Sequence, residues 1–150
     1  MIRTRVNTLS KKYSLVIFLL ALAVLSISIM ALAESYTIKT SFDKSRGTYL
    51  VCRSNLTLYY FQNDSTANGA STCYDECALL YTPFYVPKLS MPDNLKPIDF
   101  GMETRTDGRK QTTFRGWPLY YYAGDKAPGD FNGDGGAWHI VDPDNQPQVI

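Results

Sequence analysis

The sequence contains a tyrosine-rich hexapeptide twice, as Tyr59-Tyr60-Phe61-Gln62-Asn63-Asp64 and as Tyr120-Tyr121-Tyr122-Ala123-Gly124-Asp125. Both copies have the form Tyr-x-aromatic-x-x-Asp, and they lie 61 residues apart (120 − 59). Aromatic residues favour strands, whereas aspartate and glycine favour turns, so each copy predicts a strand that runs into an acidic turn. The repetition therefore predicts two related strand-turn units within one small domain.

Further short strand signals surround the two hexapeptides. Alternating or β-rich runs predict strands over residues 36–41, 48–53, 56–61, 102–106, 109–114, 118–122 and 137–141. Tight hairpin turns are expected at Ser54-Asn55 and at Asp107-Gly108. One stretch, near 74–81, has helical character, with acidic residues at its N-terminal end. The predicted fold class is therefore mostly β: a small antiparallel domain of about seven short strands with one short helix.

The alternation within each hexapeptide predicts which of its aromatic side chains are buried. Successive side chains of a strand point to opposite faces, so the first and third aromatic residues of each copy would share the core face. This phase buries Tyr59, Phe61, Tyr120 and Tyr122 and leaves Tyr60 and Tyr121 outside, although the opposite phase also fits the pattern. Outward tyrosines would offer flat amphipathic surface to an envelope protein, a glycan or a small ligand.

The first 33 residues have the pattern of a secretory signal peptide. A basic pair at 11–12 precedes an apolar run over 13–30, and Ala31-Leu32-Ala33 supplies the small residues for cleavage before Glu34. We therefore expect an exported protein in which residues 34–150 form a single domain, periplasmic or secreted.

Two other forms of membrane attachment depend on the same segment. An uncleaved signal anchor in the inner membrane is the alternative to cleavage, because the apolar stretch 15–33 could just span a bilayer. A lipid anchor would need a cysteine directly after the apolar run, and the first cysteine of the chain is Cys52. After cleavage, no transmembrane segment is expected.

Removal of the signal peptide changes the charge balance. Four of the 15 basic residues lie in the first 33, whereas all 14 acidic residues follow, so residues 34–150 carry 11 − 14 = −3. A mildly acidic domain without a cluster of lysine and arginine lacks the electrostatic footprint of a nucleic-acid-binding protein. No nucleic-acid partner is therefore expected.

The three cysteines predict one disulfide and one free thiol. Cys73 and Cys77 lie four residues apart, and a bridge between them would staple a loop onto the predicted helix. Cys52 lies in a strand-like run and predicts a buried, inert thiol. A second interpretation adds His139, the only histidine, because two thiolates and an imidazole suit copper(I) or zinc. Alternatively, His139 is a partly buried strand residue next to Trp138.

The loop after the second hexapeptide suggests a calcium site. Asp130, Asn132 and Asp134 follow the D-x-N-x-D-G spacing of the first half of a calcium loop, in which alternate oxygens converge on the ion. The second half does not fit, since the position that should hold a bidentate glutamate is Val141. Glycine, aspartate and asparagine also form turns without any ion, which is the other interpretation of this loop.

Taken together, these segments resemble a family of exported bacterial and archaeal proteins described as secreted repeats of unknown function, often lipoproteins, and named for the Tyr-x-aromatic-x-x-Asp motif. The matching segments are 56–64 with Tyr59, Phe61 and Asp64, the Cys73-x-x-x-Cys77 pair, 116–122 with Tyr120 and Tyr122, and the block from Gly124-Asp125 to Trp138-His139. The chain departs from the family in lacking a lipoprotein cysteine and in having Tyr81 where members often have tryptophan. The resemblance implies a related fold and, since the family has no established activity, no mechanism.

The sequence contains none of the common catalytic motifs. Gly-x-Ser-x-Gly, Ser-x-x-Lys and His-Glu-x-x-His are all absent, and any triad would have to use His139. We therefore expect an exported, monomeric binding or structural module of the cell envelope without catalytic activity, stapled by Cys73 and Cys77. The alternative is a copper- or zinc-binding or thiol-redox protein that uses both cysteines and His139.

Overall fold

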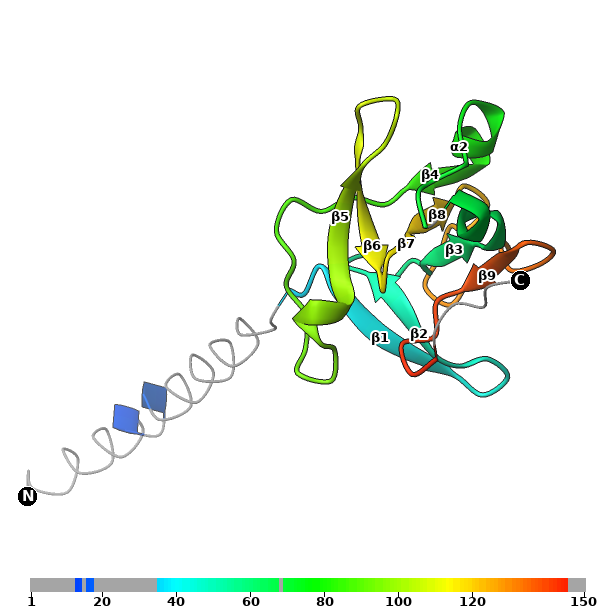
Figure 1. Cartoon of the computed structure of the whole chain (residues 1–150). Coiled ribbons are helices and arrows are strands. Elements are labelled where there is room, and N and C mark those ends of the chain that lie inside the picture. The colour runs from blue at the N-terminus through cyan, green and yellow to red at the C-terminus, as the bar shows by residue number, and fades with distance from the viewer. Residues whose placement is uncertain (1–12, 15, 18–34, 68, 146–150) are drawn as a thin grey trace, which may run out of the picture. The chain divides into compact units, whose positions relative to one another are not determined.

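The computed structural model describes residues 13–14, 16–17, 35–67 and 69–145 (Figure 1). Residues 35–67 and 69–145 belong to one compact unit. The signal peptide predicted at 1–33, its cleavage site and the alternative anchor lie almost wholly outside the described residues. Within the described part of the chain, no helix has the length and apolar character needed to cross a membrane.

The fold class predicted from the sequence is confirmed. Residues 35–67 and 69–145 form nine short strands in three small antiparallel sheets, together with one short α-helix and two 3-10 helices. The count exceeds the predicted seven partly because the run 118–122 is divided into two strands, β7 and β8, with Leu119 between them.

Two of the sheets are built around hairpins. The first pairs β1 (Ile38–Asp43) with β2 (Gly47–Cys52), in a register that runs from Ile38 opposite Cys52 to Asp43 opposite Gly47. The second has the order β5-β6-β7, with β5 (Phe100–Thr104), β6 (Lys110–Phe114) and β7 (Trp117–Pro118). Its hairpin turns at the predicted Asp107-Gly108, where Gly108 has a φ of 80° that glycine tolerates at no cost.

The third sheet has four strands in the order β4-β8-β3-β9 (Figure 1). Its members are β3 (Tyr59–Phe61), β4 (Tyr81–Pro83), β8 (Tyr120–Tyr122) and β9 (Trp138–Ile140). The two central strands are the aromatic parts of the two hexapeptides, and Tyr59 lies directly opposite Tyr120. Strands from the first and second halves of the chain therefore alternate across this sheet.

The helices are short and lie between strands. The 3-10 helix η1 (Gln62–Ala67) follows β3, and η2 (Pro97–Asp99) precedes β5. The α-helix α2 (Glu76–Leu80) falls within the predicted 74–81 and is shorter, because Tyr81 already pairs in β4.

The hairpin predicted at Ser54-Asn55 is only partly formed. The backbone N–H of Asn55 donates to the carbonyl of Cys52, and Val51 bridges Thr57 in antiparallel fashion. Of the predicted strand 56–61, however, only β3 belongs to an extended ladder, and it pairs in the four-stranded sheet rather than with β2. The partner strands of β3 are β8 and β9, which come from distant segments of the chain. A local turn signal cannot predict such pairing.

Both faces of the four-stranded sheet are covered. One buried cluster includes Leu58, Tyr60, Phe84, Leu119 and Val141, with Tyr121 packed against it. The other contains Tyr59, Cys73, Ala78, Tyr120 and Trp138, with Phe61 and Tyr122 packed against it. The two hexapeptides thus alternate in the same phase.

The prediction that Tyr60 and Tyr121 lie outside is therefore wrong. Tyr60 is only 6% exposed and Tyr121 is half-buried, because both pack against the first cluster. A strand buried on both faces keeps its alternation but has no solvent side.

Candidate functional site

The tyrosine and aspartate of each hexapeptide bond to the other copy. The Tyr59 hydroxyl donates to Asp125 Oδ2 at 2.6 Å, and the Tyr120 hydroxyl donates to Asp64 Oδ2 at 2.8 Å. All four residues are buried. Since Tyr59 and Tyr120 also face each other across the sheet, the two bonds cross between the halves of the chain in a reciprocal pair.

The second oxygen of each aspartate fixes the loop that follows its own copy. Asp64 Oδ1 accepts bonds from the backbone N–H and the hydroxyl of Thr72, at 2.8 and 2.7 Å. Asp125 Oδ1 accepts bonds from the backbone N–H and the side-chain amide of Asn132, at 3.0 and 3.2 Å. Both carboxylates are therefore fully engaged inside the fold, as buried charges must be.

Burial changes the acidity of these groups. It raises the pKa of Tyr59 and of Tyr120 far above the ordinary value near 10, with the neighbouring Asp125 and Asp64 adding to the shift. Burial also raises the pKa of Asp64, against the opposing effect of the Thr72 hydrogen bonds. The tyrosines are thus neutral donors at any physiological pH, which suits a structural bond rather than proton transfer.

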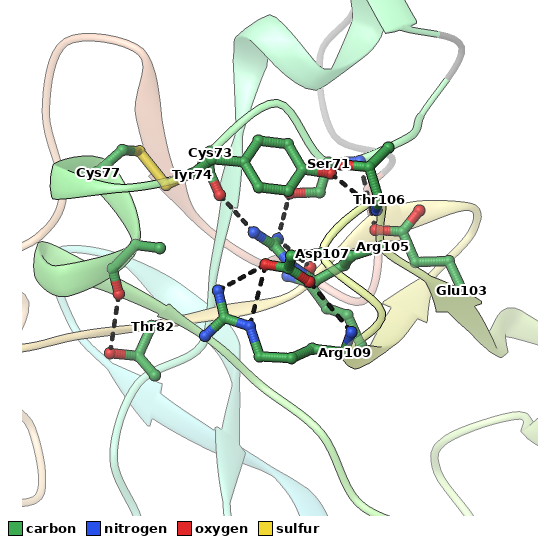
Figure 2. A network of polar contacts seen from close by, with 12 residues as sticks. Ser71, Cys73, Tyr74, Cys77, Thr82, Glu103, Arg105, Thr106, Asp107 and Arg109 are labelled. Atoms are coloured by element: carbon green, nitrogen blue, oxygen red, sulfur yellow. Dashed lines mark hydrogen bonds and ion pairs between the residues drawn. A yellow bond between two sulfur atoms is a disulfide. The ribbon is translucent and has the colours of Figure 1, made fainter.

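A buried arginine, Arg105, extends this polar network, and Figure 2 shows its contacts with Ser71 and Cys73. The Arg105 guanidinium donates to the hydroxyl of Ser71, to Gln111 Oε1 at 2.7 Å and to the carbonyl of Cys73 at 2.6 Å. Ser71 Oγ lies 2.8 Å from the Tyr120 hydroxyl, so the arginine connects to the reciprocal pair. The side chain of Arg105 is fully buried and forms an ion pair with Asp107 at 3.3 Å. No motif in the sequence had indicated that Arg105 is buried or that it belongs to a polar network.

The predicted disulfide between Cys73 and Cys77 is formed, with 5.3 Å between the Cα atoms. It joins the segment before α2 to the helix (Figure 2). Cys73 is buried in the cluster that contains Tyr59, Tyr120 and Trp138, and Cys77 packs against that cluster. Each sulfur is therefore bonded to the other in this structure.

His139 lies on the other face of the sheet from the disulfide. On β9, Trp138 and Ile140 belong to the cluster that contains both cysteines, whereas the ring of His139 lies 5.3 Å from that of Tyr60 in the first cluster. His139 Nε2 is 3.4 Å from Gln62 Oε1. The structure therefore does not bring the three candidate copper or zinc ligands together.

The three candidate calcium ligands make bonds within the protein. Asp130 Oδ2 accepts from the backbone N–H groups of Lys126 and Ala127, at 2.7 and 2.9 Å. Asp134 pairs with Arg46 across the fold, and Asn132 donates to Asp125. Among the described residues, no group of three or more histidine, cysteine, aspartate or glutamate side chains is arranged to hold a metal ion.

A pocket of about 390 Å³ opens beside the first hydrophobic cluster. It lies between the end of β2, the segment that follows β4, and the middle of β8. Its lining residues are Thr37, Cys52, Arg53, Ser54, Phe84, Val86, Pro87, Lys88 and Tyr121. The volume falls near the lower end of the roughly 300–1,000 Å³ that is usual for small-molecule sites.

The pocket combines an apolar wall with a few polar groups. The rings of Phe84 and Tyr121 pack edge to face, with centroids 5.2 Å apart. The free thiol of Cys52 lies 3.1 Å from Ser54 Oγ. Burial, together with the nearby Cys52, raises the pKa of the Tyr121 hydroxyl above its ordinary value. Predominantly apolar walls with a small number of placed polar groups are typical of ligand sites.

The division of the fold into two equivalent halves agrees with the comparison with protein families. The model of a family described as a secreted repeat of unknown function matches residues 40–83 and 101–142, which together make up more than half of the chain. The chain belongs to this family. The resemblance inferred from the sequence is thereby confirmed, and a secreted family places the protein outside the cytoplasm.

The two matched segments of this secreted repeat protein correspond to structural units. The first runs from β1 to β4, and the second from β5 to just beyond β9. Each supplies a hairpin, one central strand and one edge strand of the four-stranded sheet. No curated protein and no solved structure shows a significant similarity to the chain.

The pocket of this secreted repeat protein was not predicted from the sequence. Its lining comes from four separate segments, near residues 37, 52–54, 84–88 and 121, and these share no motif. The sequence contained one partial signal, since the free Cys52 was expected to be buried.

Proposed function

We propose that this secreted repeat protein is an envelope module that binds a small ligand without catalysing a reaction, and that it is exported through the signal peptide at residues 1–33. The observation that carries the proposal is the pocket formed by the end of β2, residues 84–88 and Tyr121. Within residues 35–67 and 69–145 it combines size, apolar walls and polar groups in the way expected of a binding site.

The rest of the polar interior supports a scaffold role. Asp64, Asp125 and Arg105 use their charged groups in bonds to other parts of the chain. Such a network holds the two halves in one geometry, which is what a preformed site needs from its surroundings. The Cys73–Cys77 disulfide adds a covalent constraint that suits an oxidising compartment.

The proposal is tested by ligand screening of the exported protein, whose mass also reports whether the chain begins at Glu34. Small acids, amines, sugars and neutral amphipaths are added singly to isotopically labelled protein, and amide shifts are recorded by NMR. We expect at least one class to shift the amides of Cys52, Val86 and Tyr121, because these residues line the pocket.

A substitution at the pocket mouth provides the control. Pro87 is exposed and lines the pocket, so Pro87→Trp should obstruct it and abolish the shifts without opening a cavity. Pro128→Trp places the same bulk at an exposed loop position outside the lining and should bind like the wild type. Absence of binding by every class, or binding that survives Pro87→Trp, would overturn the proposal.

A further inference from the structure

The charged residues that line the pocket all have the same sign. Arg53 and Lys88 are both exposed there, and no aspartate or glutamate is among the lining residues. This arrangement runs against the net charge of −3 that residues 34–150 carry. The pocket is thus a positive site on a mildly acidic protein, and the focusing of charge at a recess favours an anionic ligand.

The two cations are also available to a ligand. The ion pairs of the described residues use Arg46, Arg105, Arg109 and Arg115, and neither Arg53 nor Lys88 takes part in one. Arg53 makes one long bond to the carbonyl of Ser35, at 3.4 Å. A guanidinium and an ammonium group that have no carboxylate partner among the described residues can both donate charge-assisted hydrogen bonds to an incoming anion.

The pocket interior is suited to an apolar body. Phe84 is 1% exposed and Val86 is half-buried, and the ring of Tyr121 completes this wall. The volume of about 390 Å³ equals roughly 13 water molecules at about 30 Å³ each, so the space suits a small molecule rather than a folded segment of chain.

We propose that the pocket binds a small monocarboxylate with an apolar body, the carboxylate at Arg53 and Lys88 and the body against Phe84, Val86 and Tyr121. This inference rests on the proposed function and specifies the class of its ligand. Burial of the body supplies affinity in proportion to the apolar area removed from water, and the two cations select the charge of the head group.

The experiment uses four probes, octanoate, octanol, octylamine and acetate. Together they distinguish the contribution of the charged head group from that of the apolar chain. Binding to the exported protein is measured by calorimetry at low and high salt, and the site is located by NMR amide shifts. Octanoate should bind at least about tenfold more tightly than octanol or octylamine, since charge-assisted hydrogen bonds are stronger than neutral ones. Acetate should bind more weakly than octanoate because it has no apolar body. Added salt should weaken the binding of octanoate and leave the binding of the neutral octanol almost unchanged.

Substitution of both cations by neutral residues tests whether Arg53 and Lys88 bind the carboxylate. The double variant Arg53→Gln/Lys88→Gln should lose about tenfold in octanoate affinity and leave octanol binding unchanged. Lys44→Gln is the matched control, because Lys44 lies in the turn at the opposite end of the β1–β2 hairpin from Cys52. Its octanoate affinity should equal that of the wild type.

The outcomes separate this inference from the proposed function. Equal or tighter binding of octanol or octylamine in the pocket would overturn the carboxylate inference while supporting a ligand site. Octanoate binding that the double variant does not weaken would likewise overturn it. If no probe binds and the wider screen also finds no ligand in the pocket, both the inference and the proposed function fail.

Discussion

Tyr59, Asp125, Tyr120 and Asp64 explain at the scale of single residues why the hexapeptide occurs twice. Each tyrosine donates to the aspartate of the other copy, so neither copy is complete by itself. The aspartate of each copy lies three positions after the end of the aromatic triplet, where it can accept the partner tyrosine with one oxygen and fix its own loop with the other. The motif is a cross-link between halves rather than a set of catalytic groups.

The first prediction at this scale is that Tyr59→Phe destabilises the domain by about 1–3 kcal/mol, because Asp125 Oδ2 loses its buried donor. Denaturant unfolding measures the loss. In a double-mutant cycle with Asp125→Asn, the two effects should fail to add. Tyr85→Phe, at an exposed tyrosine, is the control and should change stability by less than about 0.5 kcal/mol. Equal effects of Tyr59→Phe and Tyr85→Phe would contradict the structural role.

At the scale of elements, α2 depends on its surroundings. A helix of five residues is too short to be stable by itself, and Asp75 at its N-terminus makes no side-chain capping bond. Its buried contact is Ala78, and its covalent tie is the disulfide to Cys73. The helix is therefore held by packing and cross-linking rather than by helix propensity.

Removing the disulfide should loosen α2 more than the central strands. The double variant Cys73→Ser/Cys77→Ser should lose about 2 kcal/mol of unfolding free energy, a modest amount because the closed loop is short. Hydrogen exchange should accelerate over residues 76–80 and remain slow in β3 and β8. Reduction of the wild type with dithiothreitol should give the same pattern. Uniform acceleration across the sheet would show that the bridge constrains the whole fold instead.

At the scale of the whole molecule, the order β4-β8-β3-β9 interleaves the two repeats. β4 and β3 come from the first repeat, and β8 and β9 come from the second, so every strand pair in this sheet joins one repeat to the other. The first hydrophobic cluster is also shared, since it contains Ile38 and Leu58 from one half and Phe114 and Leu119 from the other. Neither half contains the complete four-stranded sheet or the complete first hydrophobic cluster.

The repeats should therefore not fold separately. Fragments 35–90 and 91–150, which divide the chain between the matched segments, should each lack dispersed NMR signals and a cooperative unfolding transition. Mixing them should restore both. The full-length protein cut after residue 90 is the control and should stay folded. A cooperative transition in either fragment alone would contradict the interleaved architecture.

Much of the fold could be predicted because its signals are local. The turn at Asp107-Gly108, the short helix near Glu76 and the pairing of Cys73 with Cys77 each depend on residues a few positions apart. Local propensity and spacing report such features directly. The two related strand-turn units could also be predicted, because the hexapeptide occurs twice in the sequence.

The candidate site was beyond sequence reasoning because its parts are distant in the chain. Cys52, Phe84 and Tyr121 meet only after β2, β4 and β8 have taken their places, and Arg105 reaches Cys73 across 32 residues. Burial of a residue such as Tyr60 likewise depends on what covers the second face of its sheet. Periodicity can give the phase of a strand, but it does not reveal how many faces are covered.

By itself, the sequence determined the class of fold, the repeat, the disulfide and the family, because strand propensity, turn chemistry and motif spacing are properties of short segments. Only the tertiary structure decided that each Tyr-x-aromatic-x-x-Asp copy bonds to the other, that both faces of its strands are buried, and that Arg53 and Lys88 flank an apolar pocket. The physical reason is that hydrogen bonds and burial between distant segments form only when the whole chain packs, and alternation along a strand does not specify its partner.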